Sequence, residues 1–322
     1  MDRLVAPVVL LAYRRPEQTR RVFESIRASK PRDLFLVMDG PKPGDSNDHE
    51  RVEQTRAVVG EVDWECNVRR VYAPENLGLK ARVSSGLDAV FAEAESAIIL
   101  EDDCLPSATF FPYASELLNR FSADEKIGLV SGSQRLRGRR LSESSYEFSR
   151  DVRIWGWATW ARTWRHFRES GDLNAQWTAQ EARALGEYFA PGPRRRSMVS
   201  MMSKSTTLDS WALPFAVHCV KHGYLNPVPA VNLISNIGLG EGSTHTGLES
   251  WVAQVPQADL AFPLIHPEIV EYGGRLDEME SSLDAKAFIS FPFRRPAEVA
   301  RRLWRFGQSL LRSRLTKLGA ID

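Results

Sequence analysis

Three consecutive carboxylates form the strongest chemical signal in the sequence. Glu101, Asp102 and Asp103 come directly after the apolar run 97–100. In an open α/β sheet, ligands bind outside the carboxyl ends of the strands, which is where the triplet falls. Adjacent carboxylates repel one another, and a divalent cation that prefers oxygen ligands relieves this repulsion. The triplet therefore predicts a metal site, with an acidic turn in solvent as the alternative.

Two further segments could hold parts of a nucleotide. Asp39 ends the apolar run 34–38, where its carboxylate could accept hydrogen bonds from a base or ribose, or simply form an Asp-Gly turn. The segment that starts at Asn76 opens a predicted helix and carries Lys80 and Arg82 in its first turn. Helix N-terminal amides and two cations suit a diphosphate, and a solvent-exposed helix start is the alternative.

The second half of the chain contains two candidates for reactive groups. Asp209 stands at the start of a helix predicted over 208–222, as a general base or as a charge at the helix dipole. His245 follows a glycine-rich turn at 238–242. On a loop of this kind, a histidine could close over a metal diphosphate, and an exposed histidine is the alternative.

Tryptophan is unusually frequent in the middle part of the chain. Six of the nine tryptophans fall between positions 155 and 211. We expect Trp155, Trp157 and Trp211 to offer flat faces to a sugar ring, with Gly156 in the same pocket; core packing is the alternative. Trp160 and Trp164 are assigned to the core, because their four-residue spacing would place them on one helix face.

The elements that position these residues alternate between strands and helices. Apolar runs at 5–12, 34–38, 97–100 and 127–130, with a mixed run at 68–72, suit strands buried on both faces. Helical spacing follows Pro16, recurs over 83–91, and recurs after Ser107, which is the expected N-cap of a helix over 110–121. This order predicts an α/β fold of βαβ units, followed by a strand over 231–237.

Composition excludes several classes of protein. The 322 residues are 43% hydrophobic and 26% charged, which is typical of a globular chain. The 42 basic and 41 acidic residues give no overall charge for binding nucleic acid. Three dispersed cysteines argue against a disulfide framework or zinc cluster and favour a reducing compartment. With neither a long apolar stretch nor a signal sequence, we expect a cytoplasmic protein.

The C-terminal tail differs in charge from the remainder of the chain. Residues 294–322 contain eight Lys or Arg and two acids, and their apolar residues recur every three to five positions. The pattern predicts a basic amphipathic helix. Three roles stay open for it: peripheral contact with anionic lipid at the inner face of the cytoplasmic membrane, docking on the body, or a homodimer contact.

Taken in order, the segments that bear these residues resemble those of a known enzyme group. They read AYRRPEQT, VMDG, NLGLKARVSSGL, ILEDDCLPSATFF, IWGWATWARTW and VNLISNIGLGEGSTHT. The chain resembles the GT-A nucleotide-sugar glycosyltransferases, specifically the bacterial family-2-like enzymes, with similarity to the N-acetylglucosaminyltransferase I type. The resemblance covers residues 5 to 250.

The resemblance implies a GT-A (Rossmann-like) fold: a mixed, mainly parallel sheet flanked by helices, with the C-terminal amphipathic helix attached. Residues 1–133 would form the nucleotide-sugar-binding half. Residues 134–293 would form the acceptor-binding and catalytic half of the same domain, and 294–322 the tail helix. No nucleic acid partner is implied.

The resemblance also implies roles for single residues. Asp103 would bind Mn²⁺ or Mg²⁺, and Asp102 and Glu101 would contact the ribose or the metal shell. Asp39 would lie near uridine. The remaining roles are base or phosphate contacts for Lys80 and Arg82, the acceptor base for Asp209, and a metal or pyrophosphate contact for His245. The sequence departs from the family pattern in two places: the triplet starts with Glu, and Leu208 stands where a second acid precedes the base.

The function implied is inverting, metal-dependent transfer of a hexosyl or N-acetylhexosaminyl group. The donor would be a nucleoside diphosphate sugar, UDP-linked by resemblance, and the acceptor a hydroxyl of a glycan or glycolipid. One alternative is a sugar nucleotidyltransferase, which usually carries a Gly-rich, Arg/Lys-containing loop after the first strand, where this chain has Tyr13-Arg14-Arg15-Pro16. The other is a non-catalytic carbohydrate-binding protein on a degenerate GT-A fold.

Overall fold

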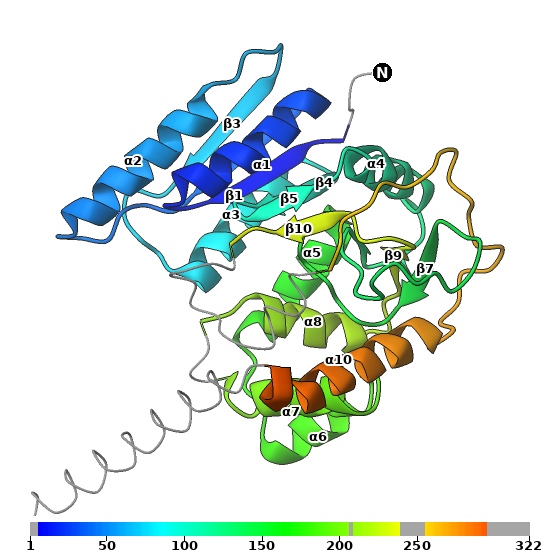
Figure 1. Ribbon diagram of the computed structural model, residues 1–322. Helices are drawn as coiled ribbons and strands as arrows, with labels where there is room; N and C mark the ends of the chain where they lie inside the picture. Colours follow the sequence, from blue (N-terminus) through cyan, green and yellow to red (C-terminus); the bar gives the residue numbers. More distant parts are fainter. Residues whose placement is uncertain (1–5, 206–208, 239–254, 295–322) are drawn as a thin grey trace, which may run out of the picture.

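The computed structural model describes residues 6–205, 209–238 and 255–294 (Figure 1). Its largest sheet has six strands. The strand order is β3-β2-β1-β4-β8-β6. The first four pair in parallel, and β8 runs antiparallel to both of its neighbours. The strands are β1 (Val8–Ala12), β2 (Asp33–Met38), β3 (Asn67–Tyr72), β4 (Ser96–Glu101), β6 (Leu129–Ser131) and β8 (Trp157–Trp160). The predicted fold class, a mixed and mainly parallel sheet flanked by helices, is confirmed.

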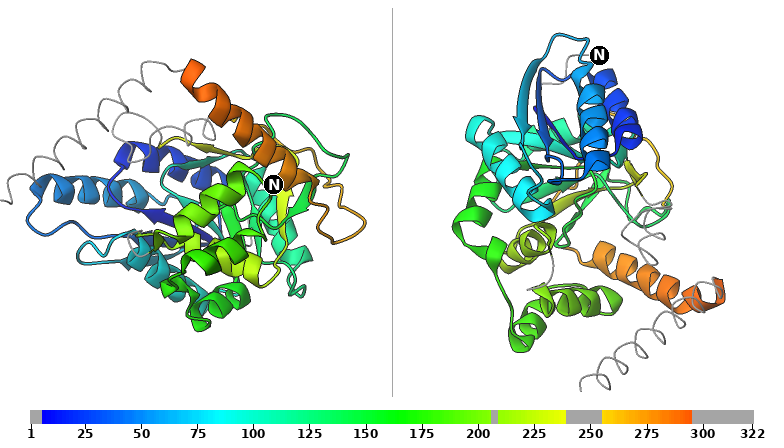
Figure 2. Two further views of the ribbon diagram at one scale, coloured as in Figure 1. Left: turned by 90° about the horizontal axis from the view of Figure 1, so that it is seen from below. Right: turned by 90° about the vertical axis from the view of Figure 1, so that its left-hand side faces the viewer.

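Helices cover both faces of the sheet (Figure 2). Alternate residues of β1 explain this, because Val8 and Leu10 pack into one hydrophobic cluster while Val9 and Leu11 pack into another. The first cluster is completed by α1 (Pro16–Ser29), α2 (Ser46–Gly60) and α4 (Phe110–Arg120). The second is completed by α3 (Leu79–Glu93), α5 (Ala161–Glu169) and α8 (Ala212–Lys221).

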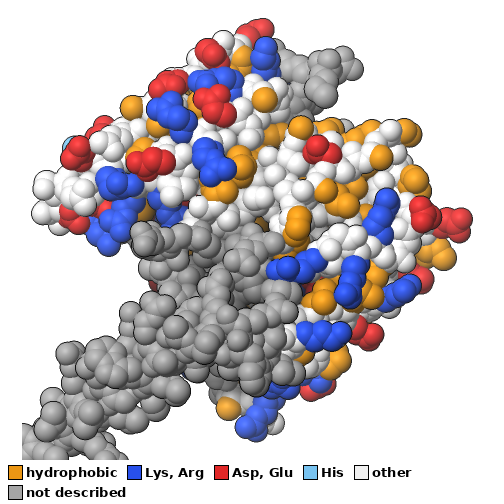
Figure 3. Space-filling model, in the orientation of Figure 1, with side chains coloured by type: hydrophobic (Ala, Val, Ile, Leu, Met, Phe, Trp, Pro, Cys, Tyr) orange, Lys and Arg blue, Asp and Glu red, His pale blue; other side chains and the backbone are white. Residues whose placement is uncertain are grey.

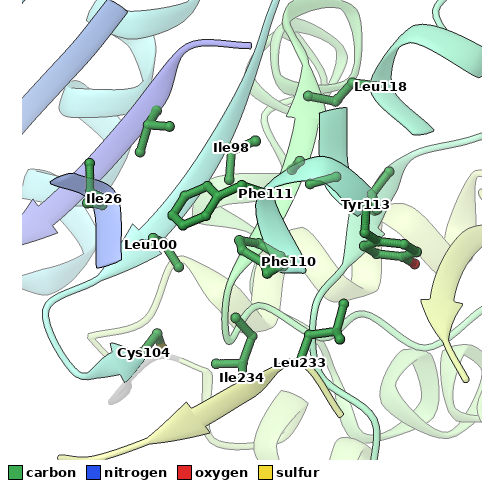
Figure 4. Packing of buried hydrophobic residues seen from close by; sticks show 14 of the residues in the cluster. Ile26, Ile98, Leu100, Cys104, Phe110, Phe111, Tyr113, Leu118, Leu233 and Ile234 are labelled. Atoms are coloured by element: carbon green, nitrogen blue, oxygen red, sulfur yellow. The ribbon is translucent and has the colours of Figure 1, made fainter. Parts of the chain in front are cut away.

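The first cluster is dense in large side chains next to the carboxyl end of β4. Phe110 and Phe111 of α4 pack near Leu100, and Ile234 lies beside Phe110 in the same cluster (Figure 4). Ile234 belongs to β10 (Ile234–Asn236), which pairs antiparallel with β5 (Cys104–Pro106) directly after the carboxylate triplet. The turn that carries the triplet therefore stands on a packed base.

Several predicted boundaries differ from the structure. The helix predicted over 208–222 starts at Ala212, and the strand predicted over 231–237 is only β10. Thr109, not Ser107, is the N-cap of α4, and its side chain makes no cap hydrogen bond. Pro193 begins a helix that the sequence patterns above do not predict, α7 (Pro193–Met202), because proline is well tolerated in a first helical turn.

The assignment of Trp160 and Trp164 to one helix face is wrong. Trp160 ends β8, and Trp164 lies on α5, so they pack into different clusters on opposite faces of the sheet. Trp160 Nε1 donates to the carbonyl of Leu118, and Trp164 Nε1 donates to Asp88 Oδ1. Both are core residues, as expected, but a strand-to-helix junction separates them.

The remaining elements complete the part that follows β6. They are β7 (Tyr146–Ser149), β9 (Asn226–Pro229), a short 3₁₀ helix η1 (Asp172–Asn174), α6 (Ala179–Gly186) and α10 (Arg275–Arg294). Strands β7 and β9 pair antiparallel, while α6, α7 and α10 lie together at the end of the molecule away from β3 (Figure 1).

Acidic and basic side chains are interspersed over α1 and α2 (Figure 3), where Arg20 pairs with Glu61 and Arg51 with Glu17. No helix in the described part of the chain has the length and apolarity needed to cross a membrane. The predicted tail helix lies outside the described residues apart from Arg294, which ends α10, so its lipid and dimer roles stay predictions.

Candidate functional site

The carboxylate triplet lies at the carboxyl end of a central strand. Glu101 is the last residue of β4, Asp102 and Asp103 form a turn, and β5 begins at Cys104. Ile98, Ile99 and Leu100 of β4 are completely buried. A strand buried on both faces fixes the direction in which its end points, so the placement of the triplet follows from the apolar run before it.

A single arginine balances the triplet within the described residues. Arg15, from the loop after β1, places Nη1 2.6 Å from Asp103 Oδ2 and 3.5 Å from Asp102 Oδ1. The backbone amide of Tyr13 also donates to Asp102 Oδ2, at 3.3 Å. Arg15 is not among the predicted site residues, although two adjacent arginines follow the first strand in the sequence.

The charge of the triplet is only partly compensated. Burial, together with the charges of Asp103 and Asp102, raises the pKa of Glu101 to about 8. Burial and the charge of Asp103 raise the pKa of Asp102 to about 7, against the opposing effect of Arg15. Additional positive charge would favour full ionisation, and carboxylate oxygens are the ligands that Mn²⁺ and Mg²⁺ prefer. The donor set thus fits a hard divalent cation.

Gly238 approaches the triplet closely. Ile237 N donates to the carbonyl of Asp103 at 2.8 Å, and Gly238 follows directly. A Cβ at position 238 would lie 2.2 Å from Asp103 Oδ2, so a side chain there would displace this carboxylate. The glycine-rich turn was visible in the sequence, but the contact of its first glycine with Asp103 is a product of the β5–β10 pairing.

Asp39 is buried and holds the loop before α3 in place. Its carboxylate accepts hydrogen bonds from Leu77 N at 2.9 Å, Gly78 N at 3.2 Å and Asn76 Nδ2 at 3.0 Å. Asp39 follows β2, and β1 alone separates β2 from β4, so Asp39 shares the carboxyl edge of the sheet with the triplet. The sequence placed these groups on one edge, and the structure brings Asn76 to them.

Asp209 binds the same helix end from 130 residues away in sequence. Its Oδ2 accepts from Leu79 N and its Oδ1 from Lys80 N, both at 3.1 Å. Asp209 is therefore not the first charge of its own helix, because Ser210 and Trp211 precede α8 and Ser210 Oγ accepts from Leu213 N. It stabilises the N-terminus of α3.

The predicted diphosphate site at the start of α3 needs correction. Four consecutive amides, those of residues 77–80, already donate to the carboxylates of Asp39 and Asp209. These amides are therefore engaged, and two carboxylates stand where the phosphates were expected. The correction concerns the amides and does not extend to Arg82. Its side chain is 8% exposed, and its Nε and Nη2 have no hydrogen-bond partner among the described residues.

The prediction that Trp157 and Trp211 face a sugar is wrong. Their side chains are 0% and 1% exposed and stack with ring centroids 5.6 Å apart. Both pack with Phe215 in the second cluster. Since each ring is enclosed by other apolar side chains, neither offers a face to a ligand.

The structure accounts for one of the other predicted residues and leaves two untested. Gly156 has φ of +57°, and a Cβ there would lie 2.3 Å from Ile234 Cδ1, so packing and backbone conformation account for this glycine. Trp155 is partly buried against the first cluster, and its sugar contact stays a prediction. His245 lies outside the described residues.

Comparisons with known proteins give little further information. No family model matches the sequence, and no curated protein matches it. Among solved structures, the chain is similar to 4-diphosphocytidyl-2C-methyl-D-erythritol synthase from Anaerococcus prevotii, with a TM-score of 0.31 and 10% identity. The match covers 68% of this chain and 98% of that one. A likeness this low carries no argument about function, which has to be argued from the residues of the site.

Proposed function

We propose that this chain is a metal-dependent glycosyltransferase that moves a sugar from a nucleoside diphosphate sugar, of the UDP class, to a hydroxyl of a glycan or glycolipid. One observation carries the proposal. Three carboxylates stand at the end of β4, two of them paired with Arg15, at the sheet edge that also holds Asp39. The triplet, together with the resemblance of the chain to GT-A enzymes, favours glycosyl transfer over carbohydrate binding without catalysis.

The residues of the triplet suit a divalent cation. Asp103 and Asp102 would hold Mn²⁺ or Mg²⁺, which supplies positive charge to a departing nucleoside diphosphate. Arg15 lies against the same two carboxylates, so it fixes their orientation and adds a second positive charge at this place. Glu101 would bind ribose or an outer ligand of the cation.

The donor nucleotide is assigned to the space between the triplet and the start of α3. Asp39 keeps the 76–78 loop in place through three hydrogen bonds. Beside it, Arg82 carries a buried guanidinium with two unpartnered nitrogens, which is costly unless a ligand provides acceptors. A phosphate or a base carbonyl would satisfy them.

Asp209 is the proposed acceptor base. The two amide hydrogen bonds orient its carboxylate. A carboxylate has about four lone-pair sites, so two bonds leave room for a hydroxyl proton. The acceptor oxygen forms a bond to the anomeric carbon, the bond to the diphosphate oxygen breaks with its electron pair, and Asp209 takes the proton. One displacement of this kind inverts the anomeric carbon.

A second candidate is a sugar nucleotidyltransferase. The position of Arg15 favours it, because a cation in the loop after β1 lies directly on the carboxylate triplet. The loop nevertheless lacks glycines, and Arg14 pairs with Asp48 at 2.7 Å, so it offers less to a triphosphate. The two reactions differ in their products, since glycosyl transfer releases a nucleoside diphosphate and nucleotidyl transfer releases pyrophosphate.

Product analysis of the full chain tests the proposal. A panel of nucleotide sugars with Mn²⁺ and hydroxyl acceptors should release UDP together with a glycosylated product, and Asp103→Asn should lower the rate by about 100-fold or more. Asp63→Asn is the matched control, because this exposed carboxylate precedes β3 at the other edge of the sheet. Pyrophosphate release from a nucleoside triphosphate and a sugar phosphate would instead establish the second candidate. Absence of transfer and of metal-dependent nucleotide binding would leave only the non-catalytic alternative.

A further inference from the structure

Three histidines gather outside the candidate site. They are His166 on α5, His218 on α8 and His222 directly after α8. One ring nitrogen from each can be chosen so that all three lie within 4.8 Å of one another. The ring centroids are 4.4 to 4.7 Å apart in every pair. His218 and His222 share a helix face because they are four residues apart, and α5 brings the third ring to them.

His218 has a buried nitrogen without a partner. Its side chain is fully buried, and Nε2 makes no hydrogen bond to any described residue. Its Nδ1 lies 2.7 Å from Asp172 Oδ2, and Asp172 also accepts from Lys221 Nζ at 3.1 Å. An ionised carboxylate can only accept, so Nδ1 carries the proton and Nε2 carries a free lone pair. An unpartnered lone pair of this kind suits a ligand that accepts an electron pair.

Each of the other two rings also has a nitrogen that makes no hydrogen bond to a described residue. His166 Nδ1 lies 2.7 Å from the hydroxyl of Tyr224, which leaves Nε2 available. His222 Nε2 lies 4.0 Å from Asp172, at the edge of ion-pair distance, and its side chain is 31% exposed. Burial and the neighbouring rings lower the pKa of His218 to about 4, which keeps this ring neutral at pH 7.

We propose that His166, His218 and His222 bind a transition-metal ion of the zinc class through three imidazole nitrogens. Asp172 and Tyr224 orient two of the rings, as carboxylate and hydroxyl groups do around metal-binding histidines. Tetrahedral Zn²⁺ with bonds of about 2.1 Å holds its ligands about 3.4 Å apart, so small side-chain rotations close the observed cluster. His166 and His222 reach solvent, which leaves a fourth position for water.

This site differs from the carboxylate triplet in chemistry and in place. Imidazole nitrogens suit Zn²⁺, Ni²⁺ and Cu²⁺, whereas the triplet offers only oxygen. The backbone amide of Ala161, at the start of α5, donates a hydrogen bond to the carbonyl of Glu95, directly before β4. Leu225, which follows the cluster in the chain, forms backbone hydrogen bonds with residues directly before β6. The histidines therefore lie at the amino edge of the sheet, opposite to the triplet. An ion there would fasten α5 to α8, and Asp209 stands at the other end of α8.

Metal titration of the untagged, chelator-stripped full chain tests the site. We expect one Zn²⁺ per chain by calorimetry and elemental analysis, a higher unfolding temperature with Zn²⁺, and visible d–d bands of four-coordinate Co²⁺. His222→Gln and His166→Gln should each weaken Zn²⁺ binding by about 100-fold or more and abolish the Co²⁺ bands, and Asp172→Asn should weaken binding by about 10- to 100-fold. Both ligand variants change solvent-accessible rings, so they should fold.

The control is His49→Gln, which changes an exposed histidine on α2 and should bind like the original chain. Zinc affinity that is unchanged in both ligand variants would overturn the proposal. So would loss of the Zn²⁺ site in Asp103→Asn with retention in His222→Gln, because the ion would then belong to the carboxylates.

Discussion

At the scale of single residues, the contacts that matter most for the proposed reaction lie at the start of α3. Asp39 and Asp209 satisfy four consecutive backbone amides between them. Asp209 is exposed and Asp39 is 5% exposed, so only Asp209 can also reach an acceptor. The same carboxylate thus has a structural role, as a helix cap, and a proposed chemical role, as a base.

Asp209→Asn separates these two roles. We expect nucleotide-sugar binding to persist, transfer to fall by about 10²- to 10⁴-fold, and stability to drop by about 1 kcal/mol. Calorimetry, product assays and urea unfolding measure the three quantities. Asp45→Asn is the matched control, because Asp45 caps α2 through Asp48 N and lies in a separate loop. Full transfer activity in Asp209→Asn would reduce Asp209 to a cap.

Gly238→Ala probes the wall of the proposed metal site. The new Cβ would lie 2.2 Å from Asp103 Oδ2, so the carboxylate must turn away. We expect Mn²⁺ affinity, measured by calorimetry, to fall by about 10-fold or more. Gly60→Ala, where a Cβ meets nothing within 4 Å, should leave it unchanged. Equal Mn²⁺ affinity in both variants would show that Asp103 is not a ligand.

At the scale of elements, aromatic packing joins β8, α5 and α8. Trp157 of β8 stacks on Trp211, and Trp164 of α5 meets Trp211 edge-on with centroids 6.2 Å apart. These rings fill the space between the antiparallel strand and the helices that cover it. The tryptophan-rich segment is therefore a structural layer, and its frequency in the sequence reflects packing.

Trp211→Ala should act on stability. Removing a fully buried indole leaves a cavity, and we expect a loss of about 3 to 5 kcal/mol in the free energy of unfolding, measured in urea. Trp155→Ala, at a partly buried position, should cost less. A Trp211→Ala protein of unchanged stability that has lost acceptor binding would contradict the core assignment.

At the scale of the whole molecule, a buried charge network fixes α10 to the body. Glu280 is 1% exposed and accepts from Arg135 N at 2.8 Å, Arg135 Nε at 3.0 Å and Arg153 Nη2 at 2.7 Å. Burial alone would raise the pKa of Glu280, but Arg153 and Arg135 outweigh it and hold the pKa below its usual value. The loop between β6 and β7 thus contributes Arg135 to this network.

Glu280→Gln should destabilise the protein by about 3 to 5 kcal/mol at pH 7, because two arginines would lose a buried counter-charge. Since the folded pKa is lowered, the stabilisation is complete above the ordinary pKa of 4.5 and is lost as pH falls through the lower folded value. The variant should therefore lose less stability than the original chain on acidification below pH 4.5. Urea unfolding over a pH series measures this, with exposed Glu278→Gln on the same helix as control. Parallel pH curves for the original chain and Glu280→Gln would contradict the assignment.

Local patterns in the sequence were sufficient for the strands of the parallel part and for the triplet. Runs such as 34–38 and 97–100 are apolar at every position, which only a strand buried on both faces explains well. Residues 157–160 gave no such signal, because a four-residue antiparallel strand leading straight into a helix looks like the helix itself. Helices α2 and α10 were missed as well, since polar residues interrupt their apolar spacing.

The sequence by itself determined the α/β class, the buried strands and the carboxylates at the end of β4, because each depends on residues next to one another in the chain. Only the tertiary structure decided what those groups meet. It brought Asp209 to α3 and Arg15 to Asp103, enclosed Trp157 and Trp211, and joined His166 to His218. These contacts link residues about 50 to 130 positions apart, and their geometry is set by packing of whole elements, which no local spacing records.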